Sequence, residues 1–122
     1  MKKLLLILIC LFVSFEVKSE NDDLSGKKLV CDSPFFITGF EFLDITKVKK
    51  ISINKRKGTI KTTTSKYSTT PVNITIGSYS IDRLTLKLIG ISDCKLIEDN
   101  LDSYMDDKLE IIVNEIKSKQ KI

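Results

Sequence analysis

Hydrophobic and polar residues alternate with a period of two over most of positions 28 to 98. Alternation of this kind is typical of antiparallel strands that bury one face and expose the other to water. Turn-forming residues interrupt it at a spacing of roughly 8 to 12 residues, which is typical of all-β folds. The pattern predicts about seven short strands, over positions 28–31, 36–43, 48–53, 59–67, 72–76, a run over 79–88 that turns at Asp82-Arg83, and 94–97. We therefore expect a mainly β fold, an antiparallel meander that forms a small barrel or sandwich.

The period changes after Asp99, where apolar residues recur at helical spacing. A single apolar stripe is formed by Leu101, Met105, Leu109, Ile112 and Ile116, and the other side carries Asp102, Asp106, Glu110 and Lys117. Asp99 or Asn100 can cap the start. We expect one C-terminal amphipathic helix from about Leu101 to Ser118. It would cover an open face or end of the sheet, or else dock on a partner or dimer helix.

The first residues have the organisation of a secretory signal peptide. Lys2 and Lys3 precede an apolar run from Leu4 to Val13, and Val17-Lys18-Ser19 ends the segment. A run of about ten residues is too short to span a bilayer, which needs roughly 20. Cleavage after Ser19 is the first interpretation; an uncleaved anchor, and a lipid-attachment site at Cys10, are the alternatives.

This signal predicts a periplasmic or secreted protein with no transmembrane span once the signal is removed. The expected organisation is a signal peptide over 1–19, a flexible lead over 20–27, a β-meander domain over 28–98 and the packed helix over 99–119. The abundance of lysine and isoleucine is typical of an AT-rich genome and indicates a bacterial source.

Two cysteines, Cys31 and Cys94, remain after cleavage. In an oxidising compartment an even pair predicts a disulfide. Closing so long a loop is worth on the order of 4 kcal/mol in the chain-entropy model. Because the chain has no histidine, two isolated cysteines do not complete a usual tetrahedral metal site, and we expect neither a metal nor a cofactor.

A basic stretch runs from Lys47 to Lys66 without any acidic residue, and it is the candidate binding site. The expected binding patch comprises Lys47, Lys49, Lys50, Lys55, Arg56 and Lys57. In one interpretation these lysines protect a sheet edge or pair with the acidic helix. In the other they bind anionic lipid headgroups, glycans or an acidic protein. Export, and the lack of stacking aromatic residues in this stretch, argue against nucleic acid.

The absence of histidine also excludes Ser-His-Asp and Cys-His catalytic arrangements. Paired carboxylates could still support glycoside hydrolysis, but we expect no enzymatic activity. The expected function is a monomeric binding or interaction protein of the cell envelope, whose partner is an envelope protein or an anionic surface. The alternative is a small lipocalin-like carrier of an apolar ligand, suggested by Phe35, Phe36, Phe40 and Phe42.

The order of parts resembles small exported proteins of unknown function from AT-rich marine alphaproteobacteria. The matching segments are Leu29-Val30-Cys31, Gly39-Phe40-Glu41-Phe42, Tyr79-Ser80-Ile81-Asp82-Arg83-Leu84-Thr85-Leu86-Lys87-Leu88 and Cys94-Lys95-Leu96. This resemblance implies export, the meander and the cysteine pairing, and it implies no activity.

The positions of Cys31-Asp32 and Cys94 are also similar to those in periplasmic lysozyme inhibitors of the membrane-bound type. That resemblance implies a small β-barrel that inhibits lysozyme. The chain departs from the family's Lys-Gly-x-x-Ala motif, since its nearest segment is Lys57-Gly58-Thr59-Ile60.

Overall fold

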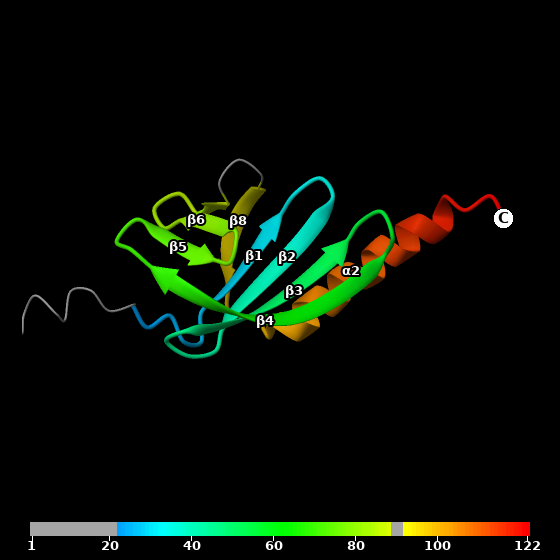
Figure 1. The fold of residues 1–122 in the computed structure, drawn as a ribbon. Helices are drawn as coiled ribbons and strands as arrows, with labels where there is room; N and C mark the ends of the chain where they lie inside the picture. The colour runs from blue at the N-terminus through cyan, green and yellow to red at the C-terminus, as the bar shows by residue number, and fades with distance from the viewer. Residues whose placement is uncertain (1–21, 89–91) are drawn as a thin grey trace, which may run out of the picture.

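The computed structural model describes residues 22–88 and 92–122, so the predicted signal peptide lies outside the described residues. Within them the chain forms eight strands followed by one helix (Figure 1). The strands are β1 (Lys28–Asp32), β2 (Phe36–Phe42), β3 (Lys47–Asn54), β4 (Thr59–Thr69), β5 (Asn73–Ile76), β6 (Tyr79–Asp82), β7 (Lys87–Leu88) and β8 (Ser92–Ile97). The helix is α2 (Leu101–Ser118).

Each strand pairs antiparallel with the next along the chain, and β8 pairs back onto β1 to close a barrel. The mainly β meander with a C-terminal helix is therefore confirmed, and the sheet closes into a barrel. The described residues contain eight strands, against about seven expected from the sequence. The run over 79–88 turns after Asp82, as expected, but in its second half only Lys87 and Leu88 form a strand, β7. The helix begins and ends at the predicted residues.

The interior of the barrel is filled by side chains from alternate positions of the strands. Phe40 and Phe42 are fully buried there. Phe42 meets Tyr67 edge to face, with ring centroids 4.8 Å apart. The same cluster includes Leu24, Leu29, Cys31, Val48, Ile74, Ile76, Ile81 and Leu88. Burial of these apolar side chains is the main stabilising contribution to a barrel of this size.

A second apolar cluster lies outside the barrel, between α2 and the outer faces of β1, β2 and β3. Its buried members are Val30, Ile37, Ile51, Ile53, Leu101, Met105 and Ile112. Asn100 caps α2, because its side chain accepts a hydrogen bond from the Ser103 backbone N–H at 3.0 Å. The expectation that the helix covers one face of the sheet is confirmed by these contacts.

Gly39 sets how closely α2 approaches the barrel. A Cβ at this position would lie 2.8 Å from Leu101 Cδ1 and 3.1 Å from Met105 Sδ. Both distances are shorter than normal van der Waals contact, so the helix packs against bare backbone at the centre of β2. The absence of a side chain at residue 39 therefore permits the burial of Leu101 and Met105.

Residues 22–27, part of the lead that we expected to be flexible, contact the barrel at the end opposite the β3–β4 turn. Leu24 is only 7% exposed and belongs to the interior cluster. The Gly26 N–H donates to the Phe42 carbonyl at 2.8 Å. The Tyr67 hydroxyl accepts from the Leu24 N–H at 3.4 Å and donates to the Asp44 carbonyl at 2.6 Å. Burial raises the pKa of this hydroxyl above its ordinary value.

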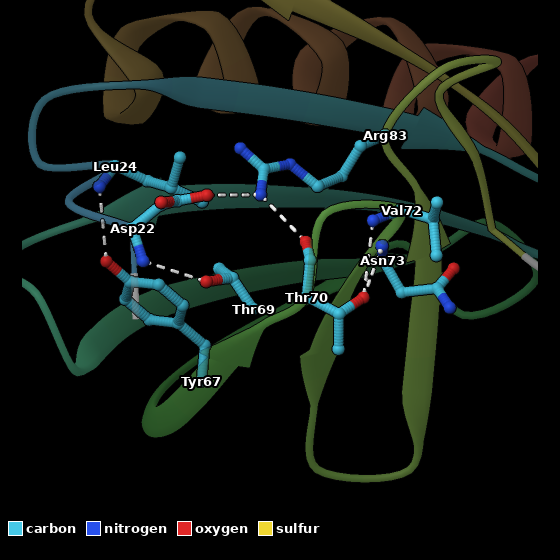
Figure 2. Close-up of polar contacts among 8 residues, drawn as sticks. All are labelled: Asp22, Leu24, Tyr67, Thr69, Thr70, Val72, Asn73 and Arg83. Atoms are coloured by element: carbon cyan, nitrogen blue, oxygen red, sulfur yellow. Dashed lines mark hydrogen bonds and ion pairs between the residues drawn. The ribbon is translucent and has the colours of Figure 1, made fainter. Parts of the chain in front are cut away.

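Figure 2 shows a second attachment of the same segment. The Asp22 carboxylate accepts a hydrogen bond from the Arg83 guanidinium at 2.5 Å, and the same nitrogen donates to the Thr70 carbonyl at 2.8 Å. The Asp22 N–H donates to the Thr69 hydroxyl at 2.8 Å. These bonds connect the N-terminal segment to the end of β4 and to the β6–β7 connection, and Arg83 in turn bonds to the β4–β5 connection.

The predicted disulfide is present between Cys31 and Cys94. The two residues lie directly opposite each other in β1 and β8, with their Cα atoms 4.0 Å apart. The bond therefore covalently joins the two strands that close the barrel, which are separated by 63 positions in the chain.

Replacing both cysteines (Cys31→Ala with Cys94→Ala) is expected to lower the free energy of unfolding by about 2–5 kcal/mol, as removal of a native disulfide from a small domain usually does. Urea denaturation with and without a reductant measures this. The double variant should be insensitive to the reductant and should match the reduced wild-type protein. Equal stability of the oxidised and reduced wild type would contradict the expectation.

Gly39→Ala is expected to cost about 1–3 kcal/mol, because the added methyl group overpacks the interface with α2. Leu101→Ala alone removes a buried side chain and should cost about 2–5 kcal/mol. Combined, the two changes should cost less than their sum, because the shortened Leu101 side chain leaves room for the methyl group. A double-mutant cycle from thermal and urea denaturation measures the coupling, and strict additivity would show that residue 39 does not limit the approach of the helix.

Candidate functional site

A positively charged cleft lies on the inner face of the β3–β4 hairpin, the face that continues the barrel interior. Its volume is about 240 Å³. The cleft is lined by Phe36, Lys50, Ser52, Asn54, Thr59, Lys61 and Thr63. This lining contains two lysines, several hydroxyl and amide groups and no carboxylate. We call it the inner cleft.

The register of the hairpin brings these side chains together. Lys50 lies opposite Thr63, Ser52 opposite Lys61, and Asn54 opposite Thr59. Directly opposite residues of antiparallel strands project from the same face of the sheet. Val48 and Tyr67 on this face belong to the interior cluster. The polar side chains of the cleft therefore lie on the same face of the sheet as the barrel core, beyond the closed part of the barrel.

The turn that joins the two strands is held by one of the cleft residues. The Asn54 side-chain oxygen accepts hydrogen bonds from the backbone N–H groups of Arg56 and Lys57, at 3.0 and 3.1 Å. Gly58 has a φ of +66° and donates its N–H to the Asn54 carbonyl at 2.9 Å. Asn54 therefore both lines the cleft and fixes the geometry of the turn.

An apolar hollow of about 410 Å³ adjoins the inner cleft at the end of the hairpin. It is lined by Phe35, Phe36, Asn54, Arg56 and Lys57. The two hollows share Phe36 and Asn54. Arg56 lies 5.6 Å from the centre of the Phe35 ring, within the range of a cation–π contact. The inner cleft and the apolar hollow together contain cations, hydroxyl groups and exposed aromatic surface that a single ligand could contact.

The structure separates the residues of the predicted binding patch. Lys50 lines the inner cleft, and Arg56 and Lys57 line the adjoining hollow. Lys47 and Lys49 lie on the outer face of β3. Strand alternation therefore places these residues on two opposite faces of the sheet.

Lys49 and Lys55 both form ion pairs with carboxylates. Lys49 Nζ lies 3.3 Å from Glu41 Oε1 and 3.2 Å from Asp102 Oδ2, so it joins β2 and β3 to α2. Partial burial lowers the pKa of Lys49, but the hydrogen bonds to Asp102 and Glu41 outweigh it and leave the pKa above its ordinary value. Lys55 Nζ lies 2.5 Å from Asp32 Oδ1 and donates to the Ser33 carbonyl.

These contacts decide between the structural roles expected for the basic stretch. Pairing with the acidic helix is confirmed for Lys49. Protection of a sheet edge does not apply to the lysines of β3, because β3 lies between β2 and β4 with a partner on each side. It fits Lys61 and Lys66, which lie in the part of β4 that pairs with β3 alone.

Sequence reasoning missed five residues of the inner cleft, namely Ser52, Asn54, Thr59, Lys61 and Thr63. The signal that could have found them is the turn over 54–58. Once Asn54 and Thr59 are taken as a pair, counting outwards places Lys61 beside Ser52 and Thr63 beside Lys50. Lys61 belonged to the basic stretch but not to the predicted patch.

The described residues also bear on two other kinds of site. Across 22–88 and 92–122, no group of three or more cysteine, aspartate or glutamate residues is placed so as to hold a metal ion. In the same part of the chain, no helix has the length and apolar character needed to cross a membrane.

Lys49→Glu and Lys50→Glu are expected to differ in their effect on stability. Lys49→Glu places a third carboxylate beside Glu41 and Asp102 and should lower the free energy of unfolding by about 1–2 kcal/mol. Lys50→Glu should cost less than about 1 kcal/mol, because its main contact is a cation–π approach of 4.9 Å to Tyr79. Urea denaturation of both variants measures this, and equal losses would contradict the assignment of the two lysines to opposite faces.

Comparison of the chain with known protein families, with curated proteins and with solved structures finds no match.

Proposed function

We propose that this protein is an exported, non-enzymatic binding protein of the cell envelope that holds an anionic ligand in the inner cleft. The observation that carries the proposal is the lining of that cleft, which brings Lys50 and Lys61 together with hydroxyl and amide groups and no carboxylate. The cystine bridge between Cys31 and Cys94 fits an oxidising compartment.

The two lysines of the cleft are available to a ligand. In the described part of the chain, neither Lys50 nor Lys61 has a carboxylate within ion-pairing distance, whereas Lys49 and Lys55 do. A hydrogen bond to a charged group contributes roughly 1.5–3 kcal/mol. Two such bonds supply enough to favour an anion over a neutral ligand, while Ser52 and Thr63 can donate further hydrogen bonds.

The carrier alternative receives no support from the barrel interior. Phe40 and Phe42, which suggested it, are 0% and 1% exposed and are packed among other core side chains. Small barrels are usually filled in this way. Phe35 and Phe36 lie instead at the surface, beside the cleft. We therefore assign the aromatic residues of this end to the binding surface.

The test is the binding of the purified mature protein to a washed bacterial envelope fraction, measured by co-sedimentation at low and high salt. Lys50→Glu combined with Lys61→Glu should weaken binding at least tenfold, because the variant presents two carboxylates to an anionic ligand. Binding by the wild type should also weaken as the salt concentration rises.

The matched control is Lys27→Glu combined with Lys87→Glu. It changes the net charge by the same amount at exposed positions outside the lining of the cleft. Its binding should stay within twofold of wild type. Equal losses in the two double variants would show a general charge effect, and wild-type binding by the cleft variant would refute the proposal.

A further inference from the structure

The first part of β4 has a partner on only one side. Residues 59–66 pair with β3, whereas β5 pairs with β4 only at Tyr67, Ser68 and Thr69. Among residues 22–88 and 92–122, no strand pairs with the other edge of 59–66. Figure 1 shows this half of β4 extending beyond β5, together with β3 and the adjoining part of α2.

The hydrogen-bonding pattern shows which backbone groups face that open edge. The Tyr67 N–H donates to the Thr46 carbonyl, on the β3 side. Groups of successive residues point to opposite sides of a strand. The Thr70 N–H accordingly donates to Asn73, on the β5 side. The N–H and C=O groups that face the open edge therefore belong to the even-numbered residues Ile60, Thr62, Thr64 and Lys66.

We propose that an extended acidic segment of a partner protein adds to this edge as a further strand. The inference rests on the proposed function and specifies its ligand: the strand's backbone pairs with β4, and its acidic side chains reach the cations around it. An open strand edge is a known template for such addition, in which main-chain hydrogen bonds give affinity and side-chain contacts give specificity.

The charges on both faces of the edge argue for an acidic occupant. Side chains of an added strand alternate between the inner and outer faces of the sheet. On the inner face they meet Lys61, and Lys50 lies across the cleft from it. On the outer face they meet Lys66, which lies opposite Lys47. β3 and β4 contain no acidic residue.

The same lysines disfavour a second copy of this chain as the occupant. Pairing β4 with another β4 would bring Lys61 and Lys66 of both copies to one seam, and edge lysines oppose pairing between identical strands. The exposed threonines favour an extended backbone without offering the apolar surface that a stable dimer buries.

The test uses a ten-residue peptide in which glutamate alternates with threonine, blocked at both ends, and measures its binding to the mature protein by fluorescence anisotropy at low salt. Thr62→Pro removes one N–H from the open edge and leaves the bonds to β3 in place. It should weaken binding at least tenfold. Thr62→Val, which also loses the hydroxyl but keeps the N–H, should stay within twofold of wild type.

A second measurement uses the wild-type protein and does not depend on the folding of a variant. A peptide in which every second amide is N-methylated keeps all its charges but has no N–H donors along one of its two edges. It should bind at least tenfold more weakly than the unmodified peptide. Amide hydrogen exchange should show new protection at Thr62 and Thr64 when the unmodified peptide is bound.

The outcomes separate this inference from the proposed function. Equal binding by both peptides, or by Thr62→Pro and Thr62→Val, would overturn strand addition and leave anion binding in the inner cleft intact. If the variant with both Lys50→Glu and Lys61→Glu bound the envelope fraction as tightly as wild type, anion binding in the inner cleft would be refuted. This would hold even if the peptide still paired with β4. A doubled mass of the free protein that Thr62→Pro returns to a monomer would make a second copy the occupant and overturn the proposal.

Discussion

The double burial of β1, β2 and β3 is the constraint on which the rest of the structure depends. One face of these strands fills the barrel, and the other packs under α2. Strands buried on both faces need apolar residues at successive positions, as in Leu29-Val30-Cys31. They also need one position without a side chain, Gly39, against which Leu101 and Met105 of the helix pack. Because α2 packs on these three strands, it does not cover the open edge of β4 at residues 59–66.

The helix and the strand positions could be predicted because their signals are local. The stripe from Leu101 to Ile116 has the period of a helix, and Asn100 is a typical N-cap residue. Alternation around Phe40 or Ile51 has the period of a strand. The closure of the sheet could not be predicted from local signals, because it depends on the pairing of β8 with β1, which lies far away in the chain. The cysteine pair was the one sequence feature that linked these two segments.

The candidate site was only partly predictable for the same reason. Composition identified the basic stretch, but which lysines share a face depends on strand register and on the position of the helix. Lys49 and Lys50 are neighbours in the sequence, yet one joins α2 to the sheet and the other lines the inner cleft. The register of the hairpin follows from its turn, whereas the pairing of Lys49 with Asp102 requires knowledge of how α2 packs on the sheet.

The exposed side of α2 carries several carboxylates. Asp106, Asp107 and Glu110 project from the helix into solvent, while Lys50 and Lys61 lie on the far side of the sheet that α2 covers. These carboxylates and the two lysines of the inner cleft therefore lie on opposite faces of the sheet. An anionic molecule that approaches the protein is repelled by the carboxylates and attracted by the lysines, so the inner cleft is the favoured side of approach. This preference weakens as ionic strength rises, because exposed charges are then screened.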